Sequence, residues 1–170
     1  MGSKTWQGQQ SQVFPAIGLV SAIDQVEENV GHRRTVLLGD FNMDPFEQGM
    51  LGAGSLHAMM SRRTAAKQSR PIGERHYRMF YNPMWGLLGD DRPGPPGTYR
   101  YWRSEHVCQE WHAYDQVLIR PDLLQAFPAG RLRILDSAGE TSLLTSQGIP
   151  TPSDHLPVVF HLGEIGEQNE

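Results

Sequence analysis

The chain has 170 residues, a formal net charge of −4 and one cysteine, Cys108. A single thiol excludes an internal disulfide framework and a zinc cluster built from thiolates, so we expect a reducing compartment, the cytoplasm. The acidic balance provides no overall attraction for a polyanion, which disfavours a tight, processive binder of nucleic acid.

One domain with a sizeable core is expected for a chain of this length. We assign residues 1–163 to that domain and residues 164–170 to a frayed tail. The first residues, MGSKTWQGQQSQ, are polar and do not resemble a signal peptide. The apolar stretches are too short to span a bilayer, so no membrane span is expected.

The first third of the chain carries the clearest pattern. Apolar residues within 14–30 recur at spacings of mostly three and four, which predicts an amphipathic helix that Gly31 ends. Residues 35–38 form a continuous apolar run, typical of a strand buried on both faces, which the following glycine ends. A short helix is predicted over residues 44–51, with Asp44 as its N-cap and a proline at its first position.

The remaining elements are shorter. Residues 52–97 predict helical segments over 55–67 and 77–87, followed by the breaker-rich sequence DDRPGPPG. Alternating or continuous apolar runs predict strands over residues 98–103, 113–119, 131–135 and 158–162.

The strongest candidate for chemistry directly follows the first predicted strand and reads Gly39-Asp40-Phe41-Asn42. A carboxylate and a carboxamide two residues apart on an extended segment point to the same side. Together they offer an acceptor for a metal ion or water and a donor for a phosphoryl oxygen. The structural alternative is an Asx-type turn, in which both side chains satisfy local backbone amides.

Two further motifs place acidic residues next to strands. The sequence SDH at residues 153–155 combines a hydroxyl, a carboxylate and an imidazole, which suit a metal ligand and a general acid or phosphate contact. The alternative is a turn in which Asp154 caps backbone amides. Asp115 opens the apolar strand over 113–119, where a carboxylate needs a cation, an imidazolium or several donors. A structural ion pair is the alternative there.

The order of these motifs, GDFN after a strand, then YDQVL and finally SDH before a strand, resembles the endonuclease/exonuclease/phosphatase family. The helix before GDFN and the sequence GTYRYWR before YDQVL match the family layout too, and the resemblance covers roughly residues 3–162. It implies an α/β fold, part of a four-layered α/β sandwich in which two mixed sheets pack face to face. It also implies a metal-dependent hydrolase of phosphodiester or phosphomonoester bonds, of the nuclease or phosphatase type.

The resemblance further implies roles for five residues. Asp40 would orient or deprotonate the attacking water, and Asn42 would donate a hydrogen bond to the phosphate. Asp154 would contact the metal ion, for which Asp40 and Asn42 are the other candidate ligands. His155 would bind a phosphoryl oxygen, and Asp115 would hold His155 as an imidazolium. Oxygen donors of this kind suit Mg²⁺ or Mn²⁺.

Some elements of the family pattern have no counterpart in this sequence. A complete member begins with a strand that carries an asparagine, continues with a Gln-Glu pair whose glutamate is the principal metal ligand, and has a histidine before the helix that precedes GDFN. We therefore expect a truncated domain without the N-terminal half of the sandwich, weak or inactive alone. Apolar surface that such a half would cover is then exposed, which favours self-association.

Several alternatives stay open. The substrate is a phosphate ester, either nucleic acid or a small phosphorylated molecule. The chain is alternatively a non-catalytic interaction or scaffold module on the same fold, or an unrelated α/β domain. The basic residues 61–70 and the aromatic residues Tyr99, Tyr101, Trp102 and Trp111 could meet a substrate. A solvated helix face and packing within strands are the simpler interpretations of these two groups.

Overall fold

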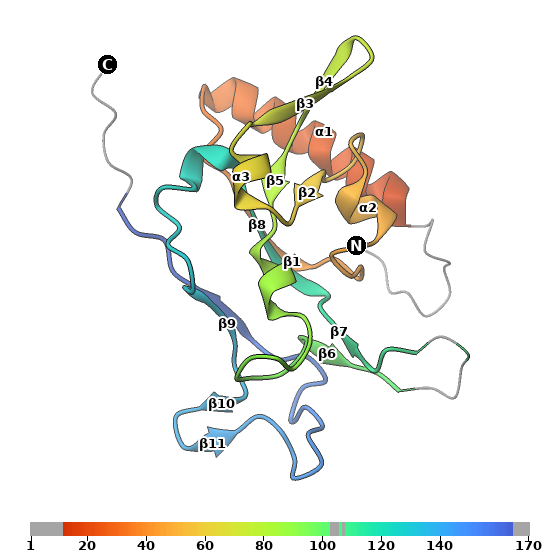
Figure 1. The fold of residues 1–170 in the computed structure, drawn as a ribbon, viewed down its shortest axis with the longest axis vertical. Helices are drawn as coiled ribbons and strands as arrows, with labels where there is room; N and C mark the ends of the chain where they lie inside the picture. The colour runs from red at the N-terminus through yellow and green to blue at the C-terminus, as the bar shows by residue number, and fades with distance from the viewer. Residues whose placement is uncertain (1–11, 103–105, 107, 165–170) are drawn as a thin grey trace.

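A four-stranded sheet with one long helix on its face organises the structure (Figure 1). The computed structural model describes residues 12–102, 106 and 108–164. The strand order is β1-β8-β5-β2, in which β8 runs antiparallel to β1 and β5, and β2 runs parallel to β5. The helix is α1 (Val13–Val30), and the strands are β1 (Val36–Asp40), β8 (Asp115–Ile119), β5 (Phe80–Tyr81) and β2 (Ala58–Met59). The chain is therefore α/β in the broad sense.

Short elements complete the described part of the chain. Two-stranded antiparallel pairs are formed by β3 (Ser69–Ile72) with β4 (Arg75–Arg78), β6 (Tyr99–Arg100) with β7 (Trp111–His112), β9 (Leu132–Ile134) with β12 (Val158–Phe160), and β10 (Ser137–Ala138) with β11 (Thr141–Ser142). Short helical turns are α2 (Gln48–Leu51), α3 (Arg62–Ala65), η3 (Pro83–Leu87) and η4 (Pro121–Leu123). No described helix combines the length and the apolar character needed to cross a membrane.

Helix α1 confirms the helix predicted over residues 14–30, but only part of its predicted apolar face is buried. Phe14, Ile17, Val26 and Val30 are exposed. The buried Ala16 and the partly buried Leu19, Val20 and Ile23 join one core with Leu37, Phe80 and Leu118 of the sheet. The helix ends at Gly31, whose φ of 75° is the left-handed conformation that glycine adopts without strain.

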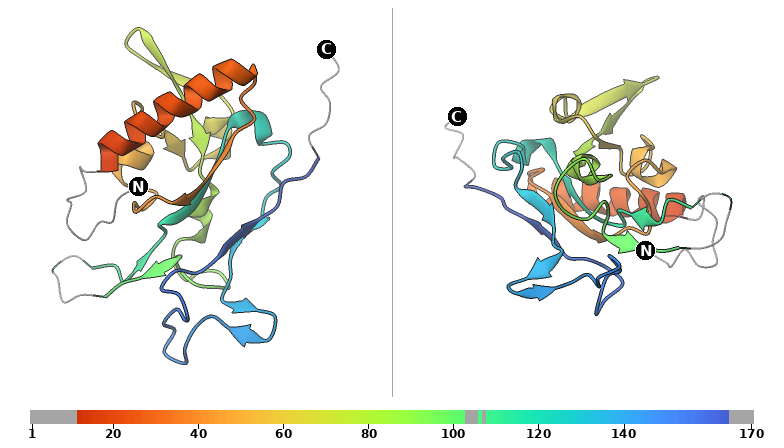
Figure 2. Two further views of the ribbon diagram at one scale, coloured as in Figure 1. Left: turned by 180° about the vertical axis from the view of Figure 1, so that it is seen from behind. Right: turned by 60° about the horizontal axis from the view of Figure 1, so that its bottom comes forward.

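Strand β8 lies between β1 and β5 and is buried from both sides, which explains its nearly continuous apolar sequence. Leu118 faces α1, whereas Val117 and Ile119 face a second core that includes residues of β9 and β12. In Figure 2 the blue strands β9 and β12 lie away from the red helix α1. The strand predicted over residues 113–119 is thus confirmed, and its two faces hold the two cores together.

Strand β1 does not have the predicted burial on both faces. Leu37 packs against α1 and Val36 reaches the second core, but Leu38 is 61% exposed. The reason is that Leu38 belongs to neither core: none of the described residues covers the face of the sheet at this position, whereas α1 covers Leu37. β1 is also an edge strand, and no strand of the described chain pairs with its outer edge. The strand also continues through Gly39, whose φ of 148° only glycine adopts readily, so that Asp40 is its last residue.

A buried ion cluster joins α1 to the far end of β8. Arg120, which is 2% exposed, donates from Nε to Glu27 Oε1 at 2.8 Å and from Nη2 to Asp24 Oδ1 at 2.9 Å. The Thr35 hydroxyl donates to the same Glu27 oxygen at 2.7 Å, and the guanidinium lies 3.9 Å above the Phe80 ring. Because every charge in the cluster has a partner, the buried arginine is tolerated.

The predicted helices between residues 44 and 87 are mostly wrong. The regular part of the first is α2, which begins after Glu47, so Asp44 does not cap it. Within 55–67 only α3 is helical, capped by the Ser61 side chain, because β2 occupies the preceding residues and pairs with β5. Within 77–87 only η3 is helical, since β4 and β5 take up the earlier positions.

The basic segment after α3 forms the β3–β4 hairpin, which turns at Gly73 with φ of 58°. Its strands read SRPI and RHYR, which lack the apolar alternation that predicts strands. The other predicted strands are confirmed in shortened form as β6, β9 and β12, although residue 103 lies outside the described residues.

Candidate functional site

Asp40 and Asp115 lie opposite each other where β1 ends and β8 begins. They are direct partners in the antiparallel register, as are Leu38 and Val117 one pair further on. Directly opposed residues leave a sheet on the same face, here the face turned away from α1. Two carboxylates in this arrangement repel each other unless each has its own donors, and the structure provides different donors for each.

Asp115 pairs with the imidazole of His155. The Nδ1 atom of His155 lies 2.6 Å from Asp115 Oδ2, and both side chains are half-buried. Because an ionised carboxylate only accepts hydrogen bonds, this contact places a proton on Nδ1. Nε2 is then the ring nitrogen that remains for a ligand, since no side chain of the described residues bonds to it.

Strand β6 brings His155 to this position. The amide of Leu156 donates to the Thr98 carbonyl at 2.7 Å, and Tyr99 and His155 form an isolated antiparallel bridge. The Thr98 hydroxyl accepts a hydrogen bond from the Asp115 amide at 3.1 Å. The Tyr99 ring lies 4.7 Å from the His155 ring, centroid to centroid. One residue, Thr98, therefore contacts both segments that carry the Asp115–His155 pair.

Asp40 and Asn42 bond to each other in a tight turn after β1. The Asn42 amide donates to Asp40 Oδ1 at 2.8 Å, and Asn42 Nδ2 donates to Asp40 Oδ2 at 3.0 Å. Asn42 has a φ of 50°, a left-handed conformation that asparagine tolerates better than most residues. The geometry is that of the Asx-type turn, and it leaves the Asp40 carboxylate exposed and directed at solvent.

Asp154 is exposed, and its carboxylate makes no hydrogen bond or ion pair within the described part of the chain. The neighbouring Ser153 hydroxyl accepts from the His155 amide at 3.1 Å, so it shapes the turn. Among the described residues no group of three or more His, Cys, Asp or Glu side chains is gathered around a metal-sized space. The oxygen donors of Asp40, Asn42 and Asp154 nevertheless have the chemistry that a hard divalent cation prefers.

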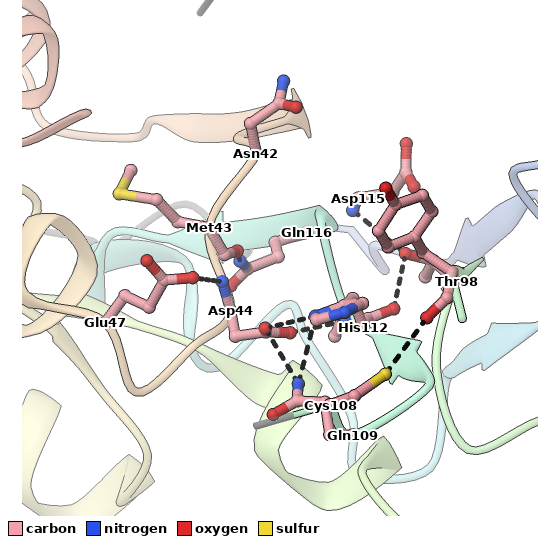
Figure 3. Close-up of polar contacts among 12 residues, drawn as sticks. Asn42, Met43, Asp44, Glu47, Thr98, Cys108, Gln109, His112, Asp115 and Gln116 are labelled. Atoms are coloured by element: carbon pink, nitrogen blue, oxygen red, sulfur yellow. Dashed lines mark hydrogen bonds and ion pairs between the residues drawn. The ribbon is translucent and has the colours of Figure 1, made fainter. Parts of the chain in front are cut away.

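A buried polar cluster around Asp44 was not predicted. Asp44 Oδ2 accepts from His112 Nδ1 at 2.7 Å and from Gln109 Nε2 at 2.9 Å, while Oδ1 accepts from the Ala113 amide at 2.8 Å. Figure 3 shows these side chains converging on one carboxylate, with Asn42 pointing away from them. The Asp-Pro pair at the start of a helical pattern suggests an N-cap, and nothing in the local sequence indicates a partner 68 residues away.

Burial changes the ionisation of Tyr114, which lies next to this cluster. Desolvation of the buried Tyr114 phenol, together with the nearby Asp44 and Glu47 carboxylates, raises the pKa of Tyr114 well above its ordinary value. The phenol therefore stays protonated across the physiological range and does not serve as a base. Glu47 in turn accepts from the Asp44 amide at 2.9 Å, which closes the turn before α2.

Gln116 occupies a buried position next to these residues. Its Nε2 donates to the Met43 carbonyl at 2.5 Å, and its Oε1 accepts from Asn82 Nδ2 at 2.8 Å. A buried amide with partners on both ends stabilises one arrangement of the surrounding segments, because any other leaves a polar group unpaired.

Of the basic and aromatic residues that could meet a substrate, some pack within the protein and others lie on its surface. Arg62 donates to the carbonyls of Leu124 and Phe127, so it contacts the protein backbone. Trp111 packs against the second core, whereas Trp102 is 67% exposed. The structure thus assigns these residues individually, and the basic segment does not form one uniform patch.

Comparisons of the chain with protein-family models, with curated proteins and with solved structures found no match.

Proposed function

We propose that the chain is a metal-dependent phosphoesterase whose site lies at the adjoining ends of β1 and β8. The observation that carries this is the cross-strand pairing of Asp40 with Asp115. It sets the Asp40–Asn42 pair and the Asp115–His155 pair side by side on one face, although they come from three separate parts of the sequence.

The chemistry of the two pairs supports hydrolysis of a phosphate ester. The reaction needs an activated water and groups that stabilise the charge developing on phosphoryl oxygens. Asp40 is an exposed acceptor suited to orient or deprotonate water. The second N–H of the Asn42 amide is a donor for a phosphoryl oxygen, and Asp115 orients the His155 ring so that Nε2 can contact another.

Asp40, Asn42 and Asp154 are the residues that would hold a divalent cation, Mg²⁺ or Mn²⁺. Each offers an oxygen donor and the two carboxylates are exposed. With two carboxylates the ion would keep most of its water, so weak binding is part of what we propose. When bound, the cation would neutralise charge on the phosphate. The proposed fold is the deoxyribonuclease-like sandwich. The mixed sheet with α1 packed on one face supports this proposal.

Hydrolysis assays with two esters test this function. We would measure turnover of bis(p-nitrophenyl) phosphate and of p-nitrophenyl phosphate with Mg²⁺, with Mn²⁺ and with EDTA. Turnover should require the cation and should be lost in Asp40→Ala and His155→Ala but kept in Glu140→Ala, a matched exposed acid between β10 and β11. In parallel, Mn²⁺ should broaden the NMR signals of Asn42. Absence of both turnover and broadening would rule the proposal out.

A second candidate function, a protein-interaction module, is favoured by one specific observation. The outer edge of β1 has no partner in the described chain, and Leu38 on this strand is 61% exposed. Unpaired edges with apolar side chains are templates for association with another chain. Sedimentation velocity over a range of concentrations distinguishes the candidates, because a module that self-associates through β1 should form dimers that Leu38→Lys dissolves.

A further inference from the structure

We infer that Asp44 and His112 form a positioning pair that holds the two halves of the candidate site together, a role that for catalysis rests on the proposed function. Asp44 lies two residues after Asn42, and His112 lies three residues before Asp115. A bond between Asp44 and His112 therefore ties the turn that carries Asn42 to the segment that leads into β8.

Burial and hydrogen bonds hold the Asp44 side chain in one position. The side chain is buried, with the residue 3% exposed, and it accepts three hydrogen bonds, from His112 Nδ1, Gln109 Nε2 and the Ala113 amide. A buried carboxylate is costly unless it is paired and fully hydrogen-bonded. The two segments therefore separate only if this carboxylate loses its partners, which strongly favours the joined arrangement.

Backbone bonds extend the connection from His112 to the reacting groups. The His112 carbonyl accepts from the Thr98 amide at 2.8 Å. Thr98 in turn contacts the Asp115 amide through its hydroxyl and the Leu156 amide through its carbonyl. A displacement of His112 should therefore displace Thr98, and through Thr98 it should change the positions of both Asp115 and His155.

Packed rings provide a second connection between the two histidines. The His112 ring lies 4.7 Å from the Tyr114 ring, Tyr114 lies 5.3 Å from Tyr99, and Tyr99 lies 4.7 Å from His155, all between centroids. On the other side of Asp44, the Phe41 amide donates to the Tyr114 carbonyl at 2.8 Å. The turn after β1 and the segment before β8 are thus joined on both sides of the carboxylate.

Substitutions at Asp44 separate positioning from general stability. Asp44→Ala removes all three acceptor bonds. Asp44→Asn retains an oxygen for the Ala113 amide and presents an N–H to His112 Nδ1, if the imidazole takes its other tautomer. The matched control is Glu27→Gln, which also neutralises a buried, hydrogen-bonded carboxylate, but in the Arg120 cluster at the opposite end of β8. His112→Phe is a fourth variant that keeps the ring and removes the bond.

Two readouts decide the outcome. The first is the ¹⁵N–¹H spectrum of the His155 ring and of the Asn42 side-chain amide. Asp44→Ala and His112→Phe should shift both sets of signals, Asp44→Asn should shift them less, and Glu27→Gln should leave them unchanged. If Asp44→Ala does not fold, His112→Phe and Asp44→Asn carry the same comparison. Signals of His155 and Asn42 that stay at their wild-type positions in these variants would overturn the inference.

The second readout is the separation of kcat from KM with bis(p-nitrophenyl) phosphate. Misplacement of reacting groups should lower kcat by about 100-fold with a smaller change in KM, partly recovered in Asp44→Asn. An equal loss of kcat in Glu27→Gln would show that the effect is general destabilisation, and would overturn the inference. If the wild-type chain hydrolyses neither ester and Mn²⁺ broadens no signal of Asn42, the proposed function fails, while the spectra of the His155 ring still decide whether Asp44 positions it.

Discussion

His155 Nδ1 lies 2.6 Å from Asp115 Oδ2, although 40 residues separate the two along the chain. A short contact between an imidazole and a carboxylate fixes the orientation of the ring. The pair therefore leaves Nε2 as the ring nitrogen that can meet a ligand at the edge of the sheet, and its contribution to chemistry can be measured by changing charge without changing shape.

Asp115→Asn is the variant that changes charge alone. The new amide oxygen can still accept from His155 Nδ1, but the negative charge beside the imidazole is lost. If His155 acts on the phosphate as proposed, kcat should fall by about 10²- to 10⁴-fold, with a small change in melting temperature. Steady-state kinetics and circular dichroism of the purified variant check this. An unchanged kcat would mean that the Asp115–His155 pair has a structural role only.

The buried histidine at position 57 should make stability depend on pH. Desolvation by burial, together with the positive charge of Arg70, lowers the pKa of His57 below its ordinary value. The unfolded chain then binds more protons than the folded one, so stability is fully present above the unfolded pKa and decreases as pH falls through it. Melting temperatures at pH 7.5 and pH 5.5 test this.

The matched control for this pH effect is His57→Asn. Asparagine tolerates the φ of 47° found at this position and can donate to the Arg78 carbonyl as the imidazole does. The variant should lose part of the decrease in melting temperature between pH 7.5 and pH 5.5. An identical pH dependence in both proteins would contradict the predicted role of His57.

Removal of one member of the buried ion cluster should be strongly destabilising. Glu27→Ala leaves the buried Arg120 guanidinium without its closest carboxylate, which should lower the free energy of unfolding by about 3–5 kcal/mol. The double variant Glu27→Ala/Arg120→Met removes both charges and should recover part of that loss. Urea denaturation measures both values, and a double variant less stable than Glu27→Ala would argue against an uncompensated charge as the cause.

The exposed leucine on β1 should tolerate a charge that the core does not. Leu38→Lys should change the free energy of unfolding by no more than about 0.5 kcal/mol, as is usual at exposed positions. Leu118→Ala, at the position on β8 that pairs with Leu37 and faces α1, should cost about 2–5 kcal/mol. Thermal denaturation of the two variants in parallel checks the contrast. A large loss in Leu38→Lys would indicate that β1 is covered in solution.

The sequence predicts well those elements whose own residues carry the pattern. Helix α1 and strand β8 follow from apolar spacing, because Leu19, Val20 and Ile23 of the helix and nearly all of β8 pack against a large core, although the apolar residues at the two ends of α1 are exposed. Strand β2 escapes prediction because its two residues are too few to carry a pattern and it pairs with β5, and the β3–β4 hairpin escapes it because its strands are polar. The apolar residues of β1 predict burial on both faces, but whether a face is buried depends on which segments pack against it, and Leu38 is left exposed.

In the candidate site, too, the sequence predicts some features, whereas others depend on tertiary contacts. The family resemblance names Asp115 and His155 together, and the structure brings them into contact. The roles assigned to Asp40, Asn42 and Asp154 stay predictions. Asp44 was interpreted as a helix cap because its local sequence fits one, whereas its true partners follow from a tertiary contact between loops. Side-chain partners of buried polar residues are therefore the part of the site that local sequence does not predict.

Gln116 has a consequence for how the chain selects its pairing during folding. If β8 slid by one residue along β1, Gln116 would turn to the other face and enter the apolar core around Val117 and Ile119. Its amide would lose both the Met43 carbonyl and Asn82. The buried glutamine thus acts against misaligned intermediates, and it is one of the side chains that favour the register in which Asp40 lies opposite Asp115.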